Sequence, residues 1–343
     1  MIDEARHRHR VALVWALIGL SPFVGEFMLG NQPITALPSL LIFAPMYGCG
    51  AVLIREVARR GGLGWTGVIL LAAAYALIEE GLVDQMLFNP GYLGLPDFSG
   101  MAVVPGLGFS ARLTLDSLIV HTVWSICVPI AVVEAFASDE TRPWLSQRGL
   151  VVTGVVFVGA CVALGAAQAD EFHFVATAAQ LGSTAAAVAV LVAGAVLVGR
   201  RKPGERSDRC APSPRRLTLA AFGASSGYWI VEFALEASTA SDEWLIMVVL
   251  GVYALISAGA LMRVSRRSGW GRRHVFAVAA GTLLTYCWLG IVHSAFVNGL
   301  SWFSLLGSVA VTTVGSAVLI LATRAQHRRD AEEMATVVQP QQT

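Results

Sequence analysis

The chain has 343 residues, of which 55% are hydrophobic and only 14% are charged, and its formal net charge is +1. Soluble domains average roughly 25% charged residues, so this composition excludes an ordinary soluble domain and indicates a membrane protein. The five cysteines show no CxxC or zinc-finger spacing, which argues against a disulfide framework and against a thiolate metal site.

A helix needs about 20 predominantly apolar residues to cross the hydrocarbon of a bilayer. Segments of this kind recur along the whole chain and predict an all-α, polytopic transmembrane helix bundle with about ten spans. The first apolar segment is followed by no A-x-A-like cleavage site, so we expect it to be retained as a helix. The predicted spans are 11–29, 34–54, 63–83, 116–137, 149–167, 175–198, 217–236, 244–263, 275–295 and 302–323.

Arginine residues predict the orientation of these spans. They collect in alternate connections, and the opposite connections contain only Arg112. Positive residues accumulate on the cytoplasmic side, so both termini are predicted to be cytoplasmic in a multi-pass protein of the cell membrane. The same rule accounts for the basic cluster at 200–216, so we expect no nucleic-acid partner.

Composition divides the chain into four parts. Residues 1–199 hold helices 1 to 6 with an outer loop at 85–115, and 200–216 form a basic cytoplasmic linker that we expect to be mobile. Helices 7 to 10 occupy 217–323, and 324–343 form a polar cytoplasmic tail that we expect to fray. Loops as long as 85–115 are often functional, and this one is either a lid over an outward-facing cavity or a surface-lying, re-entrant segment.

Polar residues recur at one depth, in the outer third of the predicted bilayer. Charged groups inside a membrane are costly and usually face the bundle interior, where they find partners. We therefore expect Glu26, Glu80, His121 and Glu232 to converge. The residues at this depth are Glu26, Glu79, Glu80, His121, Glu232 and His293, with Asn298 just beyond.

Three carboxylates lie at the end of the third span, in "YALIEEGLVDQ". Glu80 and Asp84 share a helix face, and Glu79 points about 100° away. Close carboxylates repel and tend to hold one proton, which suits a general acid, a proton carrier or a metal ligand. In the predicted threading, no basic residue lies at their depth, and only Arg112 in the loop could reach them.

Purely structural roles are open for several of these residues. Glu26 and Glu232 could reach the outer interface by snorkelling, and His293 could cap a helix end. His121 could make a structural hydrogen bond.

The glutamate pair of "IEEGLVDQ", His121 on the next helix, and His293 with Asn298 resemble the motifs of the CPBP intramembrane proteases, which include CAAX-processing endopeptidases and Abi proteins. The family pattern is EExxxR, FxxxH and HxxxN or HxxxD on consecutive helices of an eight-helix-like core. Glu79 and Glu80 match the first motif, His121 the second, and His293 with Asn298 loosely the last, and roughly 60 residues carry the better part of the resemblance. The resemblance implies that glutamate and histidine residues act on a water molecule.

The chain departs from this pattern at three points. Asp84 stands where the family has arginine, and Ser117 stands where it has phenylalanine. His293 and Asn298 are one residue farther apart than the family pattern has them. The predicted site also faces outward, whereas CAAX processing is a cytoplasmic-side activity.

These observations predict a membrane enzyme with an outward-facing acid–histidine pocket. In a hydrolase, a carboxylate would activate water, and His121 and His293 would bind a divalent metal or stabilise an oxyanion. The cofactor and the reaction class stay open. The expected catalytic residues are Glu79, Glu80, Asp84, His121 and Asn298.

Two other functions fit the same residues. An enzyme acting on an isoprenoid or other lipid would use a glutamic acid as general acid, with Glu26, Tyr75, Trp124 and Glu232 lining the substrate pocket. A proton-coupled transporter would use a carboxylate to carry the proton, although no internal repeat and no clearly broken pair of helices is evident in the sequence. In either case the expected partner is a lipid or another membrane-embedded substrate.

Overall fold

The computed structural model describes residues 2–92, 101–139, 141–199, 207–238 and 242–338. Within these ranges the protein is a bundle of ten helical units with one pair of short strands, which confirms the predicted all-α membrane fold. Nine units are long and apolar enough to span a membrane, and the tenth, α9, is the helix predicted at 217–236.

The first four units are built from several helical pieces each. They are α1 (Ile2–Pro22) with η1 (Phe23–Met28); η2 (Ile34–Ser39), α2 (Leu40–Phe43), η3 (Ala44–Gly48) and α3 (Cys49–Gly61); α4 (Gly64–Leu77) with η4 (Ile78–Val83); and α5 (Ala111–Ile119), η7 (Val120–Cys127) and α6 (Val128–Glu134).

The other six units are single helices. They are α7 (Gln147–Phe172), α8 (Ala178–Gly199), α9 (Pro214–Glu236), α10 (Glu243–Ser265), α11 (Arg272–Val297) and α12 (Trp302–Val338), and the strands are β1 (Ser207–Cys210) and β2 (Arg267–Ser268).

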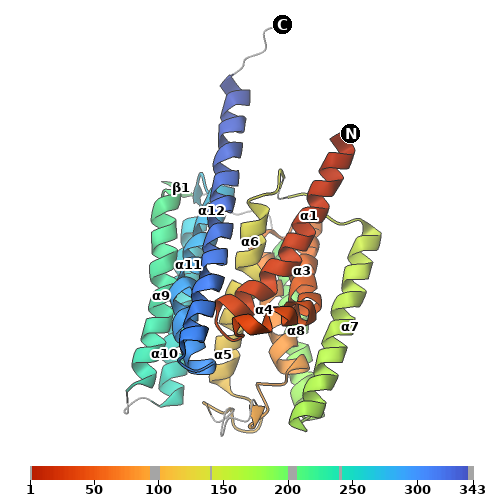
Figure 1. Cartoon of the computed structure of the whole chain (residues 1–343), viewed down its shortest axis with the longest axis vertical. Coiled ribbons are helices and arrows are strands. Elements are labelled where there is room, and N and C mark those ends of the chain that lie inside the picture. The colour runs from red at the N-terminus through yellow and green to blue at the C-terminus, as the bar shows by residue number, and fades with distance from the viewer. Residues whose placement is uncertain (1, 93–100, 140, 200–206, 239–241, 339–343) are drawn as a thin grey trace.

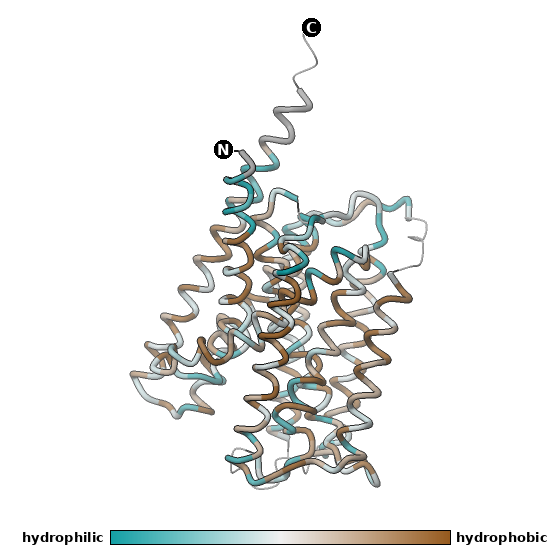
Figure 2. The backbone as a smooth tube through the Cα atoms, turned by 90° about the vertical axis from the view of Figure 1, so that its right-hand side faces the viewer, coloured by the Kyte–Doolittle hydropathy of each residue, from teal (hydrophilic) through white to brown (hydrophobic). Residues whose placement is uncertain are grey.

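The helices run up and down, and both ends of the chain leave the bundle on the same side (Figure 1). Hydrophilic residues gather at the two ends of the bundle, and hydrophobic residues dominate the length between them (Figure 2). This distribution fits a bilayer around the middle of the bundle. The assignment of one end to the cytoplasm stays a prediction.

The interior is formed mainly by α1, α3, α4, η7, α6 and α11. In contrast, the apolar stretch of α7 has no buried residue, and those of α8 and α10 are only 11% buried, so these helices present their side chains to lipid. α11 packs most extensively on α9. Side chains that the first four units direct inward therefore lie in the protected centre of the bundle.

Each of the first four units contains one π-helical segment, namely η1, η3, η4 or η7. A π-helical turn is wider than an α-helical turn and is found frequently at functional sites. Hydropathy does not distinguish the two kinds of turn, so the predicted spans do not reveal these four segments.

Two connections differ from the sequence-based prediction. α5 begins inside the expected outer loop, at Ala111, because the side chain of Ser110 accepts a hydrogen bond from the Leu113 amide. Residues 93–100 of that loop lie outside the described residues. In the linker, residues 207–210 form β1 and pair with β2, so this part is ordered, while 200–206 are not described.

The polar tail continues α12 to Val338 and does not fray from residue 324 as expected. The Asp330 carboxylate pairs with Arg273 on α11 at 2.8 Å. Arg329 donates hydrogen bonds to the carbonyl oxygens of Phe136 and Ala137. These contacts hold the polar turns of α12 against the bundle.

A second group of charges lies at the end of the bundle that is predicted to be cytoplasmic. Arg55 and Glu56 are fully buried and pair at 2.7 Å, and Arg55 also contacts Glu134 at 3.1 Å. Arg59 donates two hydrogen bonds to Glu134, and the Trp144 amide donates to Glu56. Each buried carboxylate here has cationic partners, so this group ties α3, α6 and the following loop together.

Candidate functional site

The four π-helical segments bring one set of titratable side chains together in the interior. We call Glu26, Tyr47, Glu79, Glu80 and His121 the carboxylate–histidine cluster; they come from η1, η3, η4 and η7. All five are at most 8% exposed. The contacts of η1 with η7 and of η3 with α1 and α7 place these segments around one point of the bundle.

His121 lies between two carboxylates. Its Nε2 is 2.8 Å from Oε1 of Glu80, and its Nδ1 is 3.0 Å from Oε2 of Glu79. Ser125, one turn along the same helix, places Oγ 3.2 Å from Nδ1. Adjacent helical residues diverge, as the sequence predicted, but the imidazole is wide enough to meet one glutamate at each nitrogen.

Glu26 joins the cluster through Tyr47. The Tyr47 hydroxyl donates a short hydrogen bond to Oε1 of Glu26, and the Tyr47 ring centroid lies 5.9 Å from that of His121. On the other side, Nδ2 of Asn31 lies 3.5 Å from Oε2 of Glu26. Glu26 therefore points into the protein and does not snorkel to the interface.

Asp84 lies directly after η4. The Tyr92 hydroxyl donates to Asp84 at 3.3 Å, and Nε2 of Gln168 lies 3.4 Å from the same hydroxyl. Burial and then the negative charges of Glu80 and Glu79 raise the pKa of Asp84 well above its usual range. Burial and the Asp84 charge likewise raise the pKa of Tyr92, which keeps its hydroxyl a donor. This arrangement favours a protonated Asp84.

The cluster carries more negative groups than positive ones. Glu26, Glu79, Glu80 and Asp84 contribute four carboxyl groups, and among the described residues His121 is the one cationic group in contact with them. Unpaired buried charges are costly, so the arrangement requires that protons or a bound cation neutralise the excess.

Arg112 is the basic residue that the sequence placed within reach of these carboxylates. In the structure it pairs with other acidic residues. It is 3% exposed and pairs with Glu243 at 2.5 Å, with Glu232 at 3.2 Å, and with Glu236 and Asp116. These contacts tie α5 to α9 and α10. Glu232 therefore belongs to an ion network separate from the one around His121, although convergence with Glu26, Glu80 and His121 was expected.

The two aromatic residues expected to line a substrate pocket are both buried. Tyr75 lies between Tyr47 and Phe157, with ring centroids 6.0 and 6.2 Å away. Trp124 stacks on Tyr286 at 4.8 Å. Both side chains are only 2% exposed, so they belong to the packed interior.

His293 and Asn298 lie at the end of α11, outside the cluster. Asn298 donates to the carbonyl oxygen of Gly30 at 2.9 Å, and Nδ1 of His293 has no hydrogen-bond partner among the described residues. Neither contacts His121. In the described part of the chain, no three His, Cys, Asp or Glu side chains are arranged to hold a metal ion, so the geometry does not support a metal shared by His121 and His293.

Several residues of the site had no recognisable signal in the sequence. Tyr47 and Tyr286 lie in apolar stretches, where a tyrosine is common in ordinary packing. Tyr92 and Gln168 reach Asp84 from a loop and from α7. Only the tertiary contact reveals these partners.

Comparison with known proteins places the chain in a family. No curated protein and no solved structure matches the chain. The sequence pattern of an uncharacterized membrane protein family matches residues 16–335, which include every residue of the carboxylate–histidine cluster. The chain therefore belongs to this membrane protein family.

Proposed function

We propose that the protein is a hydrolase embedded in the cell membrane, with both termini cytoplasmic, and that the carboxylate–histidine cluster activates a water molecule. The observation that carries this proposal is the position of His121 between Glu79 and Glu80 in the buried centre of the bundle. Carboxylate and imidazole groups within hydrogen-bond distance are the usual components of general acid–base catalysis.

The geometry supports a division of roles. Oε1 of Glu80 is held by His121, whereas Oε2 of Glu80 is buried with no hydrogen-bond partner among the described residues. In the proposed reaction, that free oxygen takes a proton from water and the resulting hydroxide attacks a carbonyl carbon. The bond to the leaving group then breaks, and the proton passes to that group. Glu79 keeps the imidazole oriented and charged throughout.

Glu26 and Tyr47 supply a second proton donor next to the histidine. The proposal also agrees with the resemblance of Glu79, Glu80 and His121 to the CPBP intramembrane proteases. No step requires a metal, because both nitrogens of His121 already face carboxylates. The substrate is a membrane-embedded molecule that carries an ester or amide.

A proton-coupled transporter is the second candidate, and one observation favours it. Titratable groups follow one another from Glu26 and Tyr47 past His121 to Asp84 and Tyr92, which resembles a path for protons. Proton flux into vesicles that contain the purified protein, measured with a pH-sensitive dye, would identify this function.

Hydrolysis is tested with isotopically labelled water. The purified protein is incubated with a total membrane extract in H₂¹⁸O, and the products are analysed by mass spectrometry. We expect carboxylic acids that carry one ¹⁸O atom with the wild type and with the control Glu236→Gln, and none with Glu80→Gln. Equal products from wild type and Glu80→Gln would contradict the proposal.

A further inference from the structure

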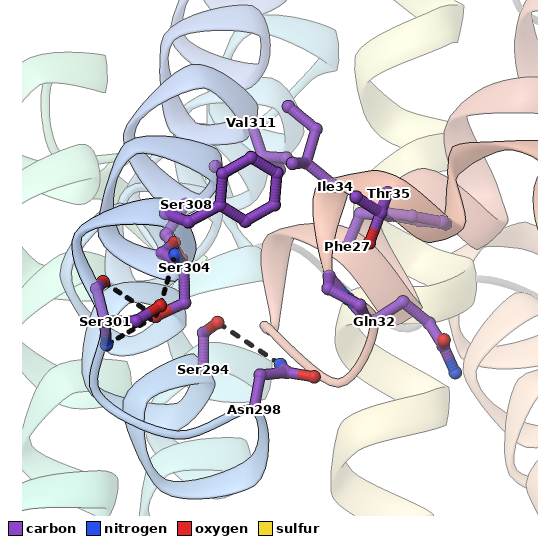
Figure 3. A pocket seen from close by; sticks show the side chains of 13 residues that line it. Phe27, Gln32, Ile34, Thr35, Ser294, Asn298, Ser301, Ser304, Ser308 and Val311 are labelled. Carbon is purple, nitrogen blue, oxygen red and sulfur yellow. Dashed lines mark hydrogen bonds between the residues drawn. The ribbon is translucent and has the colours of Figure 1, made fainter.

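A small cavity lies between the turn that follows η1 and the turn that joins α11 to α12. Its volume is about 100 Å³. One water needs roughly 10–15 Å³ on the same measure, so the cavity has room for several non-hydrogen atoms. Figure 3 shows Ser301, Ser304 and Ser308 on one side and Phe27 and Ile34 on the other. We call it the serine cavity.

The lining of the serine cavity is polar on one side and uncharged throughout. Ser294 and Asn298 extend the row of hydroxyl groups with an amide, and no Asp, Glu, Lys, Arg or His side chain is among the lining residues. A bound phosphate or carboxylate would meet no cation here. The hydroxyls of Ser301, Ser304 and Ser308 already donate hydrogen bonds within α12 and the turn before it, so their oxygens are left to accept. The chemistry therefore fits a neutral group that donates a hydrogen bond through a hydroxyl.

The surroundings of the cavity are suited to acyl chains. Large apolar side chains around the α11–α12 turn are strongly exposed: Phe296 80%, Leu300 77%, Trp302 84% and Leu306 68%. Exposed apolar side chains in this number are stable against lipid, and tryptophan is enriched where the bilayer meets water. A molecule with its head in the cavity would place its chains along these residues.

The serine cavity adjoins the carboxylate–histidine cluster through one short segment. Phe27 lines the cavity and directly follows Glu26. Asn298, on the opposite side, donates to the Gly30 carbonyl, and Asn31 reaches back to within 3.5 Å of Glu26. The segment of residues 26–31 therefore contributes both to the cavity lining and to the cluster.

We propose that the serine cavity binds the uncharged, hydroxyl- and ester-bearing head of an acylglycerol that enters sideways from the bilayer, and that it presents the ester to the carboxylate–histidine cluster. This inference rests on the proposed hydrolase function for the fate of the lipid, but binding in the cavity is independent of it.

Binding is measured with a diacylglycerol that carries a photoactivatable diazirine, in nanodiscs of phosphatidylcholine. Labelled peptides are identified by mass spectrometry. The substitutions Ser308→Leu and Thr35→Leu are made separately, and each fills the cavity from a different side. Thr313→Leu is the matched control, because Thr313 is exposed on the same helix and lies outside the lining.

We expect labelling in 27–35 and 294–308, and an approximately tenfold loss with Ser308→Leu and with Thr35→Leu, which corresponds to about 1.4 kcal/mol. Thr313→Leu and Glu80→Gln should label like the wild type. Unlabelled diacylglycerol should compete, and phosphatidylglycerol and a transmembrane peptide should not. The proposal would be overturned if only the peptide competed, or if labelling were the same in both cavity variants as in the wild type.

The two proposals fail separately. If the Glu80→Gln protein binds the probe and the ¹⁸O products do not depend on Glu80, the cavity is a lipid site and the hydrolase function is wrong. If ¹⁸O products depend on Glu80 but the probe does not label the cavity, the acylglycerol site is wrong and the hydrolase function holds.

Discussion

His121 meets one carboxylate at each of its ring nitrogens, at 2.8 and 3.0 Å. A buried ion pair adds little net stability relative to an apolar pair, but removal of its only counter-charge is costly. Here the imidazole has two carboxylate partners, so either carboxylate alone can balance its positive charge. This redundancy separates the effect of a substitution on stability from its effect on function.

Single substitution of Glu79 or Glu80 by Gln should therefore leave the fold intact. We expect a free energy of unfolding within about 1 kcal/mol of the wild type, because one ion pair with His121 persists. Activity should fall about 10²- to 10⁴-fold, since an amide does not accept the proton of water. Glu80 should be the more sensitive position because its Oε2 is the proposed acceptor of that proton.

The double variant Glu79→Gln/Glu80→Gln is the control for this argument. It leaves His121 without either carboxylate and should lose about 3 kcal/mol of stability. Thermal unfolding in detergent beside the ¹⁸O assay measures both effects. Single variants that remain fully active, or that unfold as readily as the double variant, would show that the carboxylates are structural.

Asp84 should make the wild-type protein less stable as the pH rises. Its pKa is raised in the folded state above the ordinary value of 3.8, so the folded protein holds this proton more tightly than the unfolded chain. Stability is then lost as the pH increases above 3.8 toward the folded-state pKa. The Asp84→Asn substitution removes this dependence. The difference in stability between the variant and the wild type should therefore favour the variant more at pH 8 than at pH 5.

Asp139 provides a comparison of opposite sign. The Thr141 hydroxyl donates to it at 2.6 Å and is the main cause of its lowered pKa. The contribution of Asp139 to the stability of the folded protein is present at pH values above its ordinary pKa, and it is lost as the pH falls. Unfolding temperatures from pH 4 to pH 8 check both residues, and a loss of stability for Asp84→Asn that grows toward pH 8 would contradict this assignment.

At the scale of elements, α11 positions the π-helical segment η1 through a very close backbone contact. A Cβ atom at Gly290 of α11 would collide with the carbonyl oxygen of Met28, the last residue of η1. Gly30, with φ +92°, completes the turn against the same part of α11. This contact fixes the segment that carries Glu26 and borders the serine cavity.

Gly290→Ala should consequently destabilise the protein by about 1–3 kcal/mol, the usual cost of an overpacked site. It should also reduce activity by displacing Glu26. Gly223→Ala is the matched control, since a Cβ there meets no atom within 4 Å and alanine favours a helix over glycine by about 1 kcal/mol. Denaturant unfolding of both variants measures the difference, and equal stability would refute the close contact.

At the scale of the whole molecule, orientation in the membrane follows from the arginine distribution and can be tested with a native cysteine. Cys210 is exposed in β1, on the side predicted to be cytoplasmic. In intact cells, an impermeant maleimide should leave Cys210 unlabelled. Leu107 lies in the predicted outer loop and is 50% exposed. The same reagent should label the double variant Leu107→Cys/Cys210→Ser. Labelling of Cys210 without cell lysis would reverse the topology.

Much of the fold was predictable because hydropathy acts over single helices. Each predicted span corresponds to one helical unit, and the grouping of Glu26, Glu80 and His121 at one depth follows from counting residues along those spans. The π-helical segments were not predictable, because a wider turn depends on how neighbouring helices pack. Glu232 has the same depth and apolar surroundings as Glu26, yet it pairs with Arg112.

The sequence by itself determined that this is a helical membrane protein and at which depth its acidic groups lie, because the cost of charge in lipid and the rise per residue are properties of the chain. The tertiary structure decided which groups meet. His121 pairs with Glu79 and Glu80, Arg112 pairs with Glu232, and Asn298 donates a hydrogen bond to Gly30. Rotation of each helix about its axis selects these pairs, and that rotation is set by side-chain packing between helices far apart in the chain.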